Sequence, residues 1–151
     1  MEKITNRHLG LQFRPKEFIP KNVDTFINLK YNFIENEEQQ NYEIFKIRYK
    51  ILTTNWEINE SKQGKHILGH NNYKGGSYFE TGVDIEKLAK DNLGRGKLKM
   101  DIKENWTNKE FVRIDINVGY DVDNITKIQT ETNRFSIHYD SKNKIHLVPR
   151  K

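Results

Sequence analysis

Apolar and polar residues alternate along two stretches in the first third of the chain. Residues 26–34 and 42–52 each place four apolar side chains on one side, namely Ile27, Leu29, Tyr31 and Phe33 in the first stretch and Phe45, Ile47, Tyr49 and Ile51 in the second. A period of two is typical of a half-buried β-strand. The pattern therefore predicts an N-terminal β-hairpin whose loop is the polar segment 35–41.

The pattern changes after residue 59. Residues 60–82 are rich in Gly, Asn, Lys, His and Ser and show little periodicity, which predicts a long loop of the kind that often carries function. A helical spacing follows and predicts one helix, with Thr81 or Asp84 as its N-cap and Gly94 or Gly96 at its end. Its apolar positions are Ile85, Leu88, Ala89 and Leu93.

Alternation returns in the C-terminal part of the chain. Residues 111–120, 126–139 and 144–148 predict three antiparallel strands in a meander. The pattern as a whole indicates the α+β class, with one or few helices followed by an antiparallel β-meander and preceded by an N-terminal β-hairpin. With 151 residues the chain has the length of about one ordinary domain. Residues 1–59 are expected to form a strand-rich extension that packs on the domain of residues 60–151.

The last two predicted strands form a hairpin with a defined register. A three-residue turn, 141–143, keeps one apolar set of odd-numbered residues on one face, and Asn143 in that turn can take the left-handed conformation. The set consists of Phe135, Ile137, Tyr139, Ile145 and Leu147. This register places His138 directly across from His146 on the polar face, with Cβ atoms about 5 Å apart. Arg134 and Ser136 lie further along the same face.

Two imidazoles at this distance indicate acid–base chemistry. Because they repel each other when both are protonated, one is expected to be neutral and one cationic near neutral pH, as general base and general acid catalysis requires. Arg134 offers a planar fork that suits a phosphate. The alternative is that this face is only the solvated side of an edge hairpin.

The net charge of +5 is unevenly distributed. Residues 1–60 carry nine basic and nine acidic residues, whereas residues 61–151 carry 17 basic and 12 acidic ones. Basic residues are dense from Lys62 to Lys103, and aromatic side chains accompany them, namely Tyr73, Tyr78 and Trp106. This combination favours a nucleic acid, bound by phosphate attraction and base stacking. A basic surface that only keeps the protein soluble is the alternative.

Composition excludes several kinds of site. The chain has no cysteine, which excludes disulfides, thiolate zinc sites, iron–sulfur clusters and cysteine nucleophiles. It has no run of about 18 apolar residues, and residues 1–17 lack the apolar core of a signal peptide. The spacing of His66 and His70 suits a metal only in a helix, which Gly64 and Gly69 disfavour. Neither a metal site nor a cofactor is expected.

Several motifs, in the same order along the chain, resemble those of one bacterial family. They are KQGKHILGHNNY (62–73), GSY (76–78), NWTNKE (105–110), ETNRFSIHY (131–139) and KIHLVP (144–149). Together they are similar to the polymorphic toxin type 50 (bacterial toxin 50) domain, over about residues 60–151. That domain occurs at the C-termini of bacterial toxins and in phage head-associated proteins. The segment 140–144 lacks the glycine and threonine usual in the family's final turn, so no catalytic hydroxyl is expected there.

The resemblance implies a ribonuclease of the barnase, EndoU, colicin and RelE-like fold. The expected catalytic residues are Lys65, His66, Arg134, His138 and His146. The expected substrate contacts are Lys62, Tyr73, Ser77, Asn133 and Ser136. The expected partners are an RNA substrate and a cognate immunity protein, without a membrane. The expected site of action is the bacterial cytoplasm, or delivery as part of a larger toxin or phage particle.

The reaction expected from these residues is metal-independent RNA cleavage. The ribose 2′-hydroxyl attacks the adjacent phosphorus and leaves a 2′,3′-cyclic phosphate. His66 and His138 are the expected proton-transfer pair, with His146 replacing or orienting one of them, while Lys65 and Arg134 contact the phosphate. The alternatives are a non-catalytic phage or structural module that binds nucleic acid or protein, and an inactive relative of the toxin family.

Overall fold

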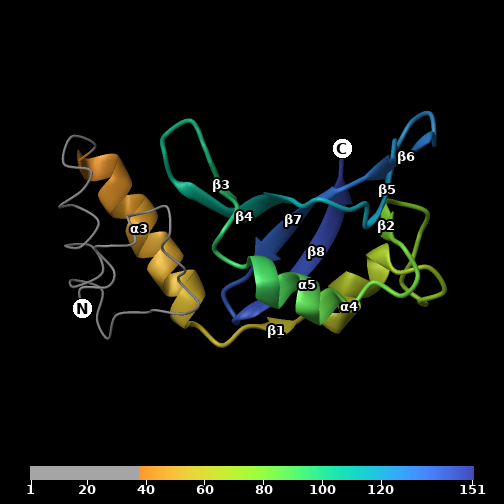
Figure 1. Ribbon diagram of the computed structural model, residues 1–151, viewed down its shortest axis with the longest axis horizontal. Coiled ribbons are helices and arrows are strands. Elements are labelled where there is room, and N and C mark those ends of the chain that lie inside the picture. The colour runs from red at the N-terminus through yellow and green to blue at the C-terminus, as the bar shows by residue number, and fades with distance from the viewer. Residues whose placement is uncertain (1–37) are drawn as a thin grey trace. The chain divides into compact units, whose positions relative to one another are not determined.

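The computed structural model describes residues 38–151, and the chain divides into two compact units, residues 1–54 and 55–151. Figure 1 shows the helices and strands of the described residues. The predicted strand at 26–34 lies outside them. Within residues 38–151, no helix has the length and the hydropathy that crossing a membrane requires.

Helix α3 (Glu38–Thr53) occupies the position of the second predicted strand, so the prediction of a strand at 42–52 was wrong. Seven of the eleven residues in 42–52 are apolar, and so dense a set satisfies the helical period as well as the strand period. The charges agree with a helix, because Lys50 lies in the last turn and the Glu43 carboxylate lies 3.6 Å from the Lys46 ammonium group.

The C-terminal unit is built on a five-stranded sheet with the strand order β1-β8-β7-β4-β3 (Figure 1). Its strands are β1 (Glu57–Ile58), β3 (Lys97–Met100), β4 (Trp106–Arg113), β7 (Arg134–Tyr139) and β8 (Lys144–Arg150). Strands β4, β7 and β8 are antiparallel neighbours, as the meander prediction requires, whereas β1 runs parallel to β8. The core lies on one face of this sheet, where Phe135, Ile137 and Leu147 are fully buried.

A second sheet has the order β2-β5-β6 and consists of β2 (Tyr78–Phe79), β5 (Gly119–Val122) and β6 (Gln129–Thr132). The predicted strands 111–120 and 126–139 are therefore each divided between two sheets, which the sequence analysis did not predict. Both divide at the same place, because backbone N–H of Ile114 donates to the Asn133 carbonyl and Asn133 Nδ2 donates to the Ile114 carbonyl, at 3.0 and 2.7 Å. Ile116, an apolar residue of the predicted strand 111–120, is 68% exposed at this bend.

Helix α5 (Ile85–Asn92) confirms the predicted helix. The Asp84 carboxylate caps it by accepting from the backbone N–H of Lys87 at 3.1 Å, and Gly94 beyond its end takes the left-handed conformation, with φ of 74°. The predicted loop 60–82 contains two short helical turns, α4 (Glu60–Gln63) and η1 (Gly64–His66), followed by β2. A few helices and mainly antiparallel sheets confirm the α+β class.

A buried carboxylate ties the core face together. The side chain of Glu110 is fully buried and accepts from the backbone N–H groups of Gly94 and Gly96 at 2.9 and 2.5 Å and from the Tyr139 hydroxyl at 2.5 Å. It therefore joins β4 and β7 to the loop that follows α5. A buried charge with several hydrogen bonds fixes the relative positions of the elements that supply them.

Candidate active site

The β7–β8 hairpin places His138 opposite His146, as predicted. Residue pairs along the hairpin include His138 with His146 and Tyr139 with Ile145. Asn143 has φ of 63°, which confirms its left-handed conformation in the turn. The centroids of the two imidazole rings lie 4.6 Å apart, with 46° between the ring planes. Local sequence thus creates this part of the site.

His66 reaches the same place through contacts that are distant in sequence. Its neighbour Gln63 is buried, and the Gln63 side-chain amide donates to the carbonyl of Leu147 at 2.9 Å and accepts from the Leu147 N–H at 2.7 Å. These two hydrogen bonds fix the α4–η1 turn against β8. The His66 ring then stacks on His146, with centroids 6.3 Å apart and 7° between the planes. His146 therefore contacts both other rings.

A hydrogen bond fixes the tautomer of His66. Its Nδ1 lies 2.9 Å from the carbonyl oxygen of Ser77, which can only accept. Nδ1 must therefore carry the proton, and in the neutral ring Nε2 has a free lone pair. Ser77 is held in turn, because its hydroxyl accepts from the N–H of Val122 at 2.9 Å and lies 3.4 Å from the Asp121 carboxylate. A general base needs this kind of orientation.

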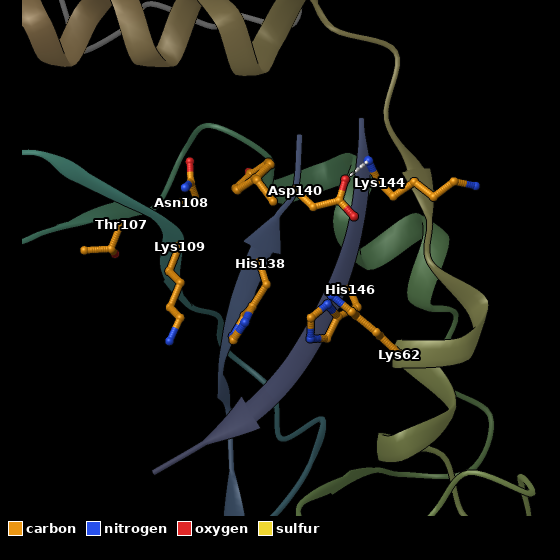
Figure 2. A pocket seen from close by; sticks show the side chains of 9 residues that line it. Lys62, Thr107, Asn108, Lys109, His138, Asp140, Lys144 and His146 are labelled. Carbon is orange, nitrogen blue, oxygen red and sulfur yellow. Dashed lines mark hydrogen bonds between the residues drawn. The ribbon is translucent and has the colours of Figure 1, made fainter. Parts of the chain in front are cut away.

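A basic pocket of about 280 Å³ lies beside His138 and His146. Figure 2 shows the two rings side by side on neighbouring strands, with Lys109 on one flank and Lys62 on the other. Lys144 also lines the pocket, and the one carboxylate in the lining, that of Asp140, accepts from the backbone N–H groups of Lys142 and Lys144 at 2.8 and 3.0 Å. The pocket therefore suits an anion.

Burial and the lysines keep the three imidazoles neutral. Burial lowers the pKa of His138 to about 4, assisted by the positive charges of Lys109 and Lys62 and by His66. Burial also lowers the pKa of His146 to about 4, assisted by His138, His66 and the nearby lysines. Burial and Lys65 lower the pKa of His66, although its bond to Ser77 opposes them. The expectation of one cationic ring in the His138–His146 pair near neutral pH therefore fails for the free protein.

The other predicted site residues have varied surroundings. Ser136 is buried, and its hydroxyl lies 2.9 Å from His138 Nε2, so it contacts the site directly. Lys65 is exposed beside His66. Arg134 is exposed on the same sheet face as His138, but four residues further along β7 and outside the pocket lining. The strand rise places it about 13 Å from His138, Cα to Cα.

Two predicted substrate contacts, Asn133 and Tyr73, and the loop residue His70 have hydrogen-bond partners within the chain. Asn133 bonds to Ile114 at the bend between the sheets. The Tyr73 hydroxyl donates to the Gly76 carbonyl at 2.8 Å, and its ring lies edge-on to Tyr78, with centroids 6.0 Å apart. His70 accepts from the backbone N–H of Asn72 at 3.0 Å. Within residues 38–151, no three His, Asp or Glu side chains are grouped to hold a metal ion.

Lys109 and Gln63 were missed by the sequence analysis. Lys109 pairs directly with His138 across β4 and β7. The alternation of residues 106–113 contains that signal, since it places Lys109 on the face opposite buried Glu110. Gln63 lies inside the recognised loop motif, but nothing in its neighbourhood indicates a bond to a strand 84 residues away.

The chain also matches a known protein family. Residues 58–149 match the model of the family described as bacterial toxin 50. The matched region runs from Ile58 in β1 to Pro149 in β8 and so contains every histidine of the cluster. No curated protein matches the chain.

Proposed function

We propose, from the premise that the chain belongs to the bacterial toxin 50 family, that it is an endoribonuclease that needs no metal ion. The single observation that carries this proposal is the row formed by Lys109, His138, His146 and His66, which lie on three strands and one helical turn beside a pocket that suits an anion. Such a row offers proton acceptors, a proton donor and positive charge around one phosphodiester.

The row suits an in-line displacement at phosphorus. The attacking and leaving oxygens lie on opposite sides of the phosphorus in such a reaction, so the base and the acid should flank it. His66 and His138 flank His146, the ring that both contact. A phosphate placed over His146 would therefore have one proton-transfer group on each side.

His66 is the proposed general base. Its Nε2 lone pair is available because Nδ1 donates to Ser77, and its lowered pKa keeps the ring neutral near pH 7. Nε2 accepts the proton of the ribose 2′-hydroxyl as the bond from O2′ to phosphorus forms. The developing negative charge on the phosphorane lies between Lys62 and Lys109, which stabilise it.

His138 is the proposed general acid. It gives a proton to O5′ as the bond from phosphorus to O5′ breaks, which leaves a 2′,3′-cyclic phosphate and a free 5′-hydroxyl. The ring must first gain that proton, because its pKa in the free protein is about 4. A bound phosphate supplies negative charge beside the ring and offsets Lys109 and Lys62, which raises the pKa toward neutrality. Substrate binding thus prepares the acid.

The test is cleavage of RNA in the presence of a chelator. Purified chain is incubated with total tRNA and rRNA in EDTA, and the ends of the fragments are identified. We expect fragments with 2′,3′-cyclic phosphate and 5′-hydroxyl ends and a bell-shaped dependence of kcat/KM on pH. RNA that changes mobility without becoming shorter would instead identify a binding module, and cleavage only after metal addition would refute metal independence.

A toxic ribonuclease also requires control in the cell that makes it. We propose that a cognate immunity protein inhibits the chain. We also propose that the chain cleaves RNA in a bacterial cytoplasm. Expression of the chain in bacteria should stop growth, and expression of the His138→Ala variant should not. Equal toxicity of both forms would show that toxicity does not come from the proposed chemistry.

A further inference from the structure

The histidines share their sheet face with a row of arginines. Residue pairs across β4, β7 and β8 define three rows on this face: Lys109, His138 and His146; Phe111, Ser136 and Val148; and Arg113, Arg134 and Arg150. None of these side chains is acidic. The face is thus continuously basic or neutral from the histidines to the arginines.

The arginine row has no acidic partner in the described part of the chain. Arg113 and Arg134 are exposed, and no carboxylate within residues 38–151 forms an ion pair with any of the three guanidinium groups. Arg150 lies over the Phe111 ring, with its Cζ 4.0 Å from the ring centroid. That contact is a cation–π interaction, and it leaves the hydrogen-bonding edge of the guanidinium available.

Three adjacent guanidinium groups repel one another in the isolated protein. Arg134 lies directly opposite Arg113 on one side and Arg150 on the other, and like charges placed in this way destabilise a sheet. A bound polyanion removes that repulsion. Each guanidinium offers a planar fork of donors that matches two phosphate oxygens.

The distance between the rows fits a chain of phosphates. Arg134 lies four residues before His138 along β7, and the strand rise makes the distance between their Cα atoms about 13 Å. An RNA strand that places its scissile phosphate at the histidines and runs along β7 therefore brings further phosphates over the arginines. The partly exposed Phe111 in the middle row offers an apolar surface beneath the intervening nucleotide.

We infer that Arg113, Arg134 and Arg150 form a second binding subsite, which holds backbone phosphates of the RNA strand on one side of the cleavage point. This inference rests on the proposed ribonuclease function. It gives Arg134 a role in holding substrate rather than in the chemical step, and it gives the site a footprint of several nucleotides.

The experiment measures binding without cleavage. A fluorescent single-stranded RNA with 2′-O-methyl groups throughout has no attacking hydroxyl, so its affinity for the protein can be followed by anisotropy at several salt concentrations. For single strands, the slope of log K against log salt changes by about 0.7 for each phosphate contact. We expect the triple variant Arg113→Gln, Arg134→Gln, Arg150→Gln to lose about 2 from this slope.

Two further variants keep the result interpretable. Arg95→Gln is the matched control, because Arg95 is exposed beyond α5 and bonds to the Asp91 carbonyl, and its slope should equal that of the wild type. The double variant Arg113→Gln, Arg134→Gln keeps the Arg150 contact with Phe111 and should lose about 1.4, with an unfolding midpoint no lower than that of the wild type.

The outcomes separate this inference from the proposed function. A slope in the arginine variants equal to that of Arg95→Gln overturns the subsite, even if the wild type cleaves RNA, and would fit a row that serves an acidic protein instead. A reduced slope in a protein whose wild type does not cleave RNA supports the subsite and refutes the catalytic proposal. A wild type that binds no RNA overturns both.

Discussion

The two faces of the five-stranded sheet treat charge in opposite ways. On the core face, the Glu110 carboxylate is fully buried and accepts hydrogen bonds from two backbone N–H groups and one hydroxyl. On the other face, three histidines have lowered pKa values and three arginines lack carboxylate partners within residues 38–151. Satisfied polar groups stabilise the fold, whereas unsatisfied ones indicate where a ligand supplies what is missing.

Removal of the proposed proton-transfer groups should have the largest effect. We expect His66→Ala and His138→Ala each to lower the rate of RNA cleavage by about 10²- to 10⁴-fold, since each removes one acid or base. Circular dichroism and the unfolding midpoint should stay close to those of the wild type. His70→Ala is the matched control, because His70 lies in the same loop but is exposed and outside the cluster. Full activity in both variants would refute the mechanism.

Loss of the buried Glu110 carboxylate should destabilise the core face of the sheet. Glu110→Ala leaves the N–H of Gly94 and the hydroxyl of Tyr139 without an acceptor in the core, and each buried unpaired group is worth about 1–3 kcal/mol. We expect a free energy of unfolding lower by about 3–5 kcal/mol in urea titrations. Exposed Glu86→Ala should change it by about 0.5 kcal/mol or less. Equal effects of the two changes would show that Glu110 does not hold the core.

Acid should destabilise the folded protein through the histidine face. The pKa values of His138 and His146 are about 4 in the folded protein and about 6.5 when it is unfolded, so below pH 6.5 the unfolded chain binds protons that the folded one does not. Stability is therefore complete above pH 6.5 and falls toward pH 4. We expect a loss of roughly 1–3 kcal/mol after allowance for solvent screening of these partly exposed rings. A double His138→Gln, His146→Gln variant that declines equally would contradict this assignment.

The Gln63 amide should matter for both stability and activity. Gln63→Leu removes two buried hydrogen bonds to Leu147 and should lower the free energy of unfolding by about 1–3 kcal/mol. The same hydrogen bonds hold the turn that carries His66. We therefore expect the fall in kcat to be larger, as a fold-change, than the change in KM. A variant with normal kcat would show that His66 is positioned by Ser77 alone.

The smallest expected effect is electrostatic. Lys109→Gln removes a positive charge that lowers the pKa of His138, so this pKa should rise above about 4 while staying below 6.5, because burial is the larger cause. A titration of the ring by NMR measures the change. Lys142→Gln, which lies in the exposed turn, serves as the control. A pKa that does not move would show that Lys109 acts on the phosphate but not on the ring.

The sequence predicts those parts of the fold whose signals are local. The β7–β8 hairpin was predicted with its register because alternation and a turn asparagine agree within seventeen residues, and α5 because its cap and its period agree. The segment 42–52 misled because its apolar residues fit both periods. The bend at Asn133 was missed because alternation continues across it and the bonds that cause it join residues 19 apart.

The site divides in the same way. His138 and His146 were brought together correctly from the pattern alone, whereas the position of His66 depends on a bond between residues 84 apart. Arg134 was correctly placed on the histidine face, but it lies four residues from His138 along β7 and outside the pocket lining. The neutral state of the rings follows from burial and from Lys109, which meets His138 only when β4 pairs with β7.

The way Gln63 covers β8 also affects how the protein behaves at high concentration. Backbone groups that a strand leaves unpaired toward the outside of a sheet can recruit strands from other chains, and the two-residue strand β1 covers only the start of β8. Here Glu57 and Asn59 occupy the carbonyls of Asn143 and Ile145, and the Gln63 amide occupies both groups of Leu147. The next outward residue, Pro149, has no N–H to offer. The edge therefore gives a neighbouring copy little to pair with, and self-association into fibres is disfavoured there.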